Sequence, residues 1–329
     1  MKKFLWIGLS IVVLWFLYIW VQYHFLYKSY SQEEINSIFK KENLEPPVYD
    51  SIFLRGYQIY YLTNKLNRNV ELDPNTNKRK PYLVLLHDGG KSSNYFLDYF
   101  KNKNTNSRYH IIAIDRLGFG KSHFIKPESE QYIFPPDKVE YGEHAEYVNS
   151  IAPKEILGQE GQHLEETRIV SDGKTAYVGL RAYNSNYLSF VKTFLFYPDL
   201  DKRSSIAKFF SKTVAMQPIS YLFPRAFVNK HRDLIMLDEP KDRADDNTLG
   251  NAKYSEDQAN EGYNNLNMKT VFFITDNEKE KQKIRKDIGN DKNFIIDVEK
   301  KESIYTNPSF VNDIIMKNDV YNFDFNRIK

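Results

Sequence analysis

The stretch that decides the fold runs Tyr82-Leu-Val-Leu-Leu-His-Asp-Gly-Gly90, and a related stretch runs His110-Ile-Ile-Ala-Ile-Asp-Arg-Leu-Gly-Phe-Gly-Lys-Ser122. Each contains a short, continuous apolar run, which is typical of a strand buried on both faces of a sheet. The segment between them is long enough for a helix, and its residues Asn94 to Phe100 are amphipathic. We therefore predict a βαβ unit whose two strands are parallel.

The loops that follow these two strands resemble those of the α/β-hydrolase superfamily. The first loop reads His-x-Gly-Gly and the second reads Asp-Arg-x-Gly-Phe-Gly-x-Ser, in the order that the family uses. The resemblance implies a structural role for the second loop. It implies that the first loop, formed by His87, Asp88, Gly89 and Gly90, corresponds to the loop that lends a backbone N–H to the oxyanion hole, where glycine allows a close approach to the substrate.

The resemblance extends over about residues 50–316. Residues 52–62 have the composition of a strand with a glycine in the middle. The segments that look like later core strands begin at Val191, Thr270 and Asn293. We expect an α/β fold with a mostly parallel central sheet, helices on both of its faces, and a cap over about residues 200–268.

The family carries a Ser nucleophile in a Gly-x-Ser-x-Gly turn between a strand and a helix. We interpret Thr175 to Gly179 as that strand, which places Arg181 at the nucleophile position. A guanidinium is always protonated and cannot accept an acyl group. Ser185 lies nearby in a polar run that is typical of a surface loop.

The catalytic His of the family follows its last core strand, and none of the seven histidines of this chain does so. Lys301 or Glu302 stands at that position instead. Neither side chain can transfer the proton of a Ser hydroxyl as a neutral imidazole does. Asp276 and Glu278 lie where the family carries its acid, and we interpret both as solvated carboxylates. The sequence therefore predicts the fold without the conventional triad.

Phe4 to Val21 is an apolar run without a charge, and about 20 such residues cross a bilayer. A cleaved signal peptide is the alternative, although its apolar region is shorter and ends in small residues. We predict a tail and transmembrane anchor at 1–22, a juxtamembrane helix and linker at 23–46, and the hydrolase-like domain at 47–329. Lysines at positions 2 and 3 favour a single-pass protein with its N-terminus in the cytoplasm and its domain on the other side.

Composition narrows the set of partners. The 46 basic and 43 acidic residues give a net charge of +3, so we expect no nucleic-acid surface. The absence of cysteine excludes disulfides, thiolate metal sites and a Cys nucleophile. We expect no cofactor and no metal, and the sequence identifies no protein partner.

These observations favour a membrane-anchored pseudohydrolase that acts as a binding or scaffolding module. Its cleft would take a small-molecule, acyl or anionic ligand. Two alternatives stay open. One is an active hydrolase of acyl or lipid esters that uses rearranged groups, such as Ser185 with His144 or His163. The other is an envelope structural protein that uses the domain only for protein contacts.

Overall fold

The structure is a computed structural model of the full chain. It describes residues 2–21, 29–54, 57–64, 80–89, 91–116, 119–124, 139–140, 167–176, 178, 191–198, 206, 209–210, 213–214, 219–224, 228, 237–238, 270–288 and 295–320. The statements below concern these residues.

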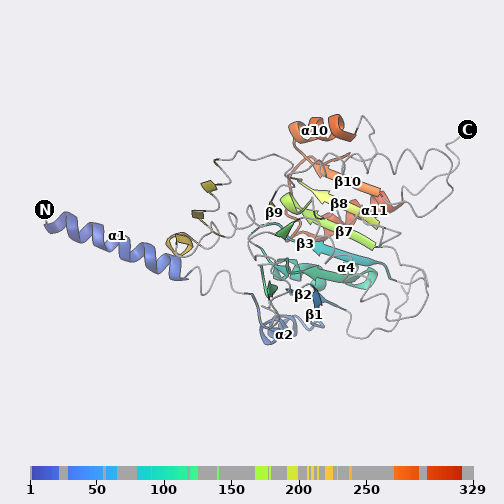
Figure 1. Ribbon diagram of the computed structural model, residues 1–329. Helices are drawn as coiled ribbons and strands as arrows, with labels where there is room; N and C mark the ends of the chain where they lie inside the picture. Colours follow the sequence, from blue (N-terminus) through green and yellow to red (C-terminus); the bar gives the residue numbers. More distant parts are fainter. Residues whose placement is uncertain are drawn as a thin grey trace, which may run out of the picture.

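The domain is built on a sheet of nine strands in the order β1-β2-β4-β3-β7-β8-β10-β11, with β5 paired to β2 (Figure 1). The strands are β1 (Val48–Leu54), β2 (Tyr57–Thr63), β3 (Tyr82–Leu86), β4 (His110–Ile114), β5 (His123–Phe124), β7 (Thr167–Asp172), β8 (Val191–Phe196), β10 (Thr270–Thr275) and β11 (Ile295–Asp297). From β4 to β11 every neighbouring pair is parallel, whereas β2 is antiparallel to its partners. Two short strands, β6 (Val139–Glu140) and β9 (Leu237–Asp238), form a separate parallel pair.

Both faces of this sheet are covered. The described helices and 3-10 turns are α1 (Lys2–Val21), α2 (Gln32–Lys41), η2 (Ser93–Phe96), α3 (Leu97–Lys101), α4 (Lys103–Arg108), η3 (Gly173–Thr175), η4 (Ile219–Leu222), α10 (Glu278–Ile288) and α11 (Pro308–Val320). On one face, Phe39 of α2, Phe100 of α3 and Ile315 of α11 join alternate strand residues in one apolar cluster. The strand residues between them, such as Val84 and Ile169, point to the other face and are also fully buried.

The predicted βαβ unit is confirmed. Strands β3 and β4 have the predicted bounds, and they pair in parallel from Tyr82 with His110 to Leu86 with Ile114. The prediction of one strand over residues 52–62 is wrong, because β1 ends at Leu54 and β2 begins at Tyr57 as its antiparallel partner. The sequence contained a signal for this break, because a glycine within a strand pattern often indicates an interruption.

The helix predicted before the domain is present as α2. Ser31 begins it with a capping box, in which the N–H of Glu34 donates to Ser31 Oγ and the N–H of Ser31 donates to Glu34 Oε2. The Gln32 side chain accepts a hydrogen bond of 3.0 Å from the N–H of Tyr49, which fixes α2 beside β1.

Helix α1 covers the apolar N-terminal run and extends away from the body of the domain (Figure 1). Its apolar side chains are exposed from Trp6 to Trp20, apart from Ile19, which is buried. Within the described residues, no helix has both the length and the apolar character needed to cross a membrane. The transmembrane anchor is therefore not confirmed.

Candidate functional site

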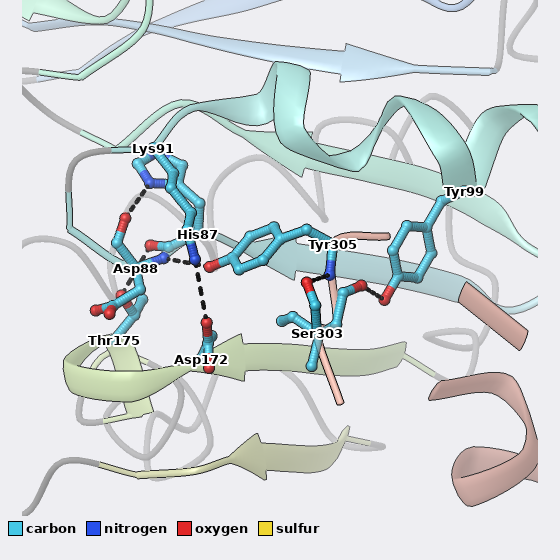
Figure 2. Close-up of polar contacts among 9 residues, drawn as sticks. His87, Asp88, Lys91, Tyr99, Asp172, Thr175, Ser303 and Tyr305 are labelled. Atoms are coloured by element: carbon cyan, nitrogen blue, oxygen red, sulfur yellow. Dashed lines mark hydrogen bonds and ion pairs between the residues drawn. The ribbon is translucent and has the colours of Figure 1, made fainter. Parts of the chain in front are cut away.

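The candidate site lies where the carboxyl ends of the central parallel strands meet. In open α/β sheets this edge is where ligands bind. His87 and Asp88 directly follow strand β3, strand β7 ends in Asp172, and Tyr305 reaches the same place from the segment between β11 and α11 (Figure 2).

His87 joins the ends of neighbouring strands. The N–H of Arg116 donates to His87 Nε2 at 3.0 Å, so the ring proton is assigned to Nδ1, which lies 2.9 Å from the Asp88 carbonyl oxygen. The side chain is fully buried, and its carbonyl oxygen accepts a hydrogen bond of 2.8 Å from Thr175 Oγ1. Both ring nitrogens thus contact backbone groups, which makes His87 a structural residue of this loop.

The turn after β7 places Gly173 against Asp88. Gly173 has a φ of +58°, a conformation that residues with a Cβ rarely adopt. A Cβ at this position would lie 2.5 Å from Asp88 Oδ2, closer than atoms in contact approach. The Asp88 carboxylate therefore occupies the space into which a side chain at residue 173 would extend.

This turn corrects the sequence interpretation of the same region. The predicted strand over residues 175–179 is wrong, because the strand is β7 and Thr175 already belongs to η3. Ala176 and Val178 have helical backbones, so the change from strand to helix falls at Gly173. Ser171 lies within β7 and is fully buried.

Several residues of the sequence interpretation lie outside the described residues. They are Gly90, Arg181, Ser185, His144 and His163. The assignment of Arg181 to the nucleophile position, and of Ser185 with a histidine to an alternative site, therefore stay predictions. Gly89 is described, and it is half-buried at the end of the His87–Asp88 loop.

Lys91 and Asp172 face each other beside Tyr305. Lys91 Nζ lies 3.6 Å from Asp172 Oδ2 and 3.5 Å from the centre of the Tyr305 ring, while the N–H of Asp88 donates to the Tyr305 hydroxyl at 2.9 Å (Figure 2). Burial and the nearby Asp88 carboxylate raise the pKa of Asp172, and Lys91 partly offsets this rise. Burial lowers the pKa of Lys91, against the opposing effects of Asp172 and Asp88.

Lys301 and Glu302 lie near this cluster. Lys301 is exposed and its Nζ lies 4.6 Å from the centre of the Tyr197 ring, while the N–H of Glu302 donates to the Tyr197 hydroxyl at 2.8 Å. The charge of Lys301 lowers the pKa values of both Lys91 and Asp172, which places it within electrostatic reach of the pair.

The two residues of the acid region are exposed. Asp276 follows β10, and Glu278 at the start of α10 forms an ion pair of 2.7 Å with Lys281. Neither carboxylate has a contact in the Lys91–Asp172 cluster among the described interactions. This agrees with the prediction of solvated side chains.

Sequence reasoning missed Gly173, Lys91, Asp172 and Tyr305 as members of one site. Strand β7 reads Thr-Arg-Ile-Val-Ser-Asp, in which only two residues are apolar, although its first five residues are buried. The available signal was the glycine directly after that Asp. In the sequence Ile-Val-Ser-Asp-Gly, the Asp-Gly pair indicates a turn, and the Ile-Val pair before it is consistent with the end of a strand.

Solved structures of other proteins share this fold, although their sequences differ from that of this chain. No family model matches the chain, and no curated protein matches it. The thioesterase domain from the curacin biosynthetic pathway superposes with a TM-score of 0.51 at 8% identity, over 83% of this chain and 100% of that chain. Two further structures superpose less closely. The N-acyl homoserine lactonase AidH gives a TM-score of 0.49 at 11% identity, over 82% of this chain and 95% of that chain. The haloalkane dehalogenase DatA from Agrobacterium tumefaciens C58 gives 0.47 at 12% identity, over 84% of this chain and 96% of that chain.

Proposed function

We propose that this chain, which has the α/β-hydrolase fold, is a membrane-attached pseudohydrolase that binds a ligand at the carboxyl edge of its sheet. The carrying observation is Gly173. In enzymes of this fold the nucleophile projects from a strained turn between a central strand and a helix. The turn after β7 has that position, and its left-handed residue has no side chain.

A second observation agrees with the loss of the nucleophile. The Asp88 carboxylate stands where the side chain of residue 173 would begin. A serine introduced at residue 173 would displace the Asp88 carboxylate from its present position. Lys301 and Glu302 at the expected His position point the same way, because neither is a proton acceptor suited to neutral pH.

The ligand of such a module would meet Lys91 and Lys301 first. Lys91 is partly exposed beside the largely buried Asp172, and Lys301 is exposed nearby. Two ammonium groups at one edge favour a ligand with an anionic head group, and we propose that the rest of this ligand is an acyl chain. A long-chain fatty acid has both features.

Membrane attachment through α1 is part of this proposal. A helix that is apolar on all sides is stable only in apolar surroundings. The side chains of α1 are apolar around the helix and mostly exposed. Lys2 and Lys3 at its N-terminal end favour an N-terminus in the cytoplasm with the domain on the other side.

The catalytic part of the proposal is tested with the full chain in non-ionic detergent. We expect no turnover of short or medium acyl esters and no labelling by a fluorophosphonate, which reacts with activated serines. An active serine hydrolase added to the same sample controls for inhibition by the detergent. Turnover that survives purification and disappears in Lys91→Met would show that the site is active and would overturn the proposal.

The binding part is tested by titrating a fluorescent long-chain fatty acid into the full chain. We expect saturable binding that Lys91→Met and Lys301→Met weaken and that Lys300→Met leaves unchanged. Lys300 is the matched control because it is the exposed neighbour of Lys301. Equal affinity in all four proteins would contradict a site at this edge.

A further inference from the structure

The segment from residue 202 to residue 232 combines exposed apolar side chains with a one-sided charge. Ile206 is 81% exposed and Phe209 is 74% exposed, and Phe210 and Leu222 are about half exposed. Such side chains seldom gather on a surface that faces only water. Ile206, Phe209 and Phe210 also follow the spacing of neighbours on one helix face.

The charges of the same segment have one sign. From residue 202 to residue 232 the sequence contains no Asp or Glu, and it contains Lys202, Arg203, Lys208, Lys212, Arg225, Lys230 and Arg232. The whole chain carries 46 basic and 43 acidic residues, so this excess is local. Basic residues interleaved with Phe, Ile and Leu are typical of segments that lie in the surface of an anionic membrane.

The position of this segment beside α1 is consistent with a membrane as its partner. The indole N–H of Trp15 in α1 donates a hydrogen bond of 3.1 Å to the carbonyl oxygen of Leu222 in η4, and the two elements are in contact. Figure 1 shows the short helical pieces of this segment between α1 and the body of the domain. Trp15 precedes the last residue of α1, Val21, by six residues, which is about 9 Å along a helix axis.

We infer that Ile206, Phe209, Phe210 and Leu222 insert into the interfacial layer of an anionic lipid bilayer beside α1. This inference rests on the proposed membrane attachment of α1. If α1 is inserted up to its last residue, Leu222 lies about 9 Å below that end, within the depth of about 5–10 Å that interfacial segments reach. The exposed side chains of Ile206, Phe209 and Phe210 then enter the acyl boundary, and the local excess of basic residues in the sequence favours anionic head groups.

The absence of cysteine makes the test direct, because a single introduced cysteine carries the only label. The full chain is reconstituted in vesicles of phosphatidylcholine and phosphatidylglycerol, with an environment-sensitive fluorophore at Phe209→Cys. Phe53→Cys in strand β1 is the matched control, since Phe53 is 61% exposed and lies outside the segment. A quencher attached to lipid acyl chains then reports which label is in the bilayer.

We expect a blue-shifted emission and loss of most fluorescence to the lipid-borne quencher at position 209, and neither at position 53. Equal behaviour of the two labels would overturn the inference. So would a blue shift at position 209 without lipid quenching, because that result indicates cover by a second protein copy. A third label at Leu9→Cys in α1 distinguishes the failure of this inference from the failure of the proposed membrane attachment. An unquenched label at position 9 would refute the membrane attachment itself.

Charge is tested in the same vesicles. The triple substitution Lys202→Glu, Lys208→Glu and Lys212→Glu is expected to reduce the quenching at position 209. The matched triple substitution at the exposed Lys103, Lys279 and Lys300 is expected to leave it unchanged. Vesicles of phosphatidylcholine alone should mimic the first triple variant. Equal quenching in both variants would contradict recognition of anionic head groups.

Discussion

Gly120 and Gly173 have almost the same local geometry in two different settings. Their φ angles are +56° and +58°, and each faces a carboxylate at the carboxyl edge of the sheet. Asp115, which faces Gly120, is fully buried and accepts hydrogen bonds from the N–H groups of Ser93 (2.7 Å) and Lys121 (2.9 Å). Asp88, which faces Gly173, is only half-buried.

The different burial of the two carboxylates indicates that the two turns have different roles. Asp115 holds two loops together, so Gly120 is required by a network that connects β2, the end of β4 and the start of η2. Asp88 lies beside Lys91 and Asp172, where partly exposed charges meet. Gly120 therefore serves a buried hydrogen-bond network, whereas Gly173 stands where we propose that the nucleophile has been lost.

The largest effect is expected from Gly120→Ala. A left-handed conformation costs a residue with a Cβ about 1–2 kcal/mol, and displacing Asp115 would break buried hydrogen bonds worth about 1–3 kcal/mol more. We expect a loss of about 3 kcal/mol in the free energy of unfolding, measured with urea in non-ionic detergent. Gly8→Ala is the control, because nothing lies within 4 Å of a Cβ at Gly8. Equal stability of the two variants would remove the basis of the comparison.

A smaller effect is expected from Gly173→Ala. The cost of the left-handed backbone, about 1–2 kcal/mol, remains, but the half-buried Asp88 side chain has room to turn away. The double substitution Asp88→Gly with Gly173→Ala should lose less stability than the sum of the two single substitutions, because the two positions share one space. Urea unfolding of the four proteins of this cycle measures the coupling. Strictly additive losses would show that Asp88 does not fill the site.

Much of the fold could be predicted where buried strands consist of apolar residues. Strand β3 reads Tyr-Leu-Val-Leu-Leu, so its place in the sheet is evident from apolar residues alone. Strand β7 pairs with β3 from Thr167 to Ser171, yet Thr167, Arg168 and Ser171 are buried polar residues. A pattern based on hydrophobicity cannot detect a strand that tertiary packing buries against its composition.

The candidate site was predicted in part for the same reason. The loop from His87 to Gly89 follows a strand that the sequence marks clearly, so its position was correct. Gly173 follows the strand that the sequence conceals, and the search for a nucleophile moved to Arg181 instead. Lys91 and Tyr305 meet only in the folded chain, over a separation that no local pattern covers. The incorrect bounds of this strand therefore moved the expected turn away from Gly173.

The smallest effect is expected from the titration of Asp172. Burial and Asp88 raise its folded-state pKa, so the folded chain binds this proton more tightly than the unfolded chain does. The contribution of Asp172 to stability is therefore greatest at a pH below its unfolded pKa and falls as the pH rises through the folded value.

This sign is tested with the variant Asp172→Asn. The difference in unfolding free energy between wild type and Asp172→Asn should favour wild type more at about pH 4.5 than at about pH 7, two values above the ordinary pKa of Asp. Asp276→Asn, at an exposed carboxylate, serves as the control. If this difference in unfolding free energy grew with pH instead, Asp172 would form a stabilising ion pair with Lys91. The turn at Gly173 would then be held by a polar network, as the turn at Gly120 is.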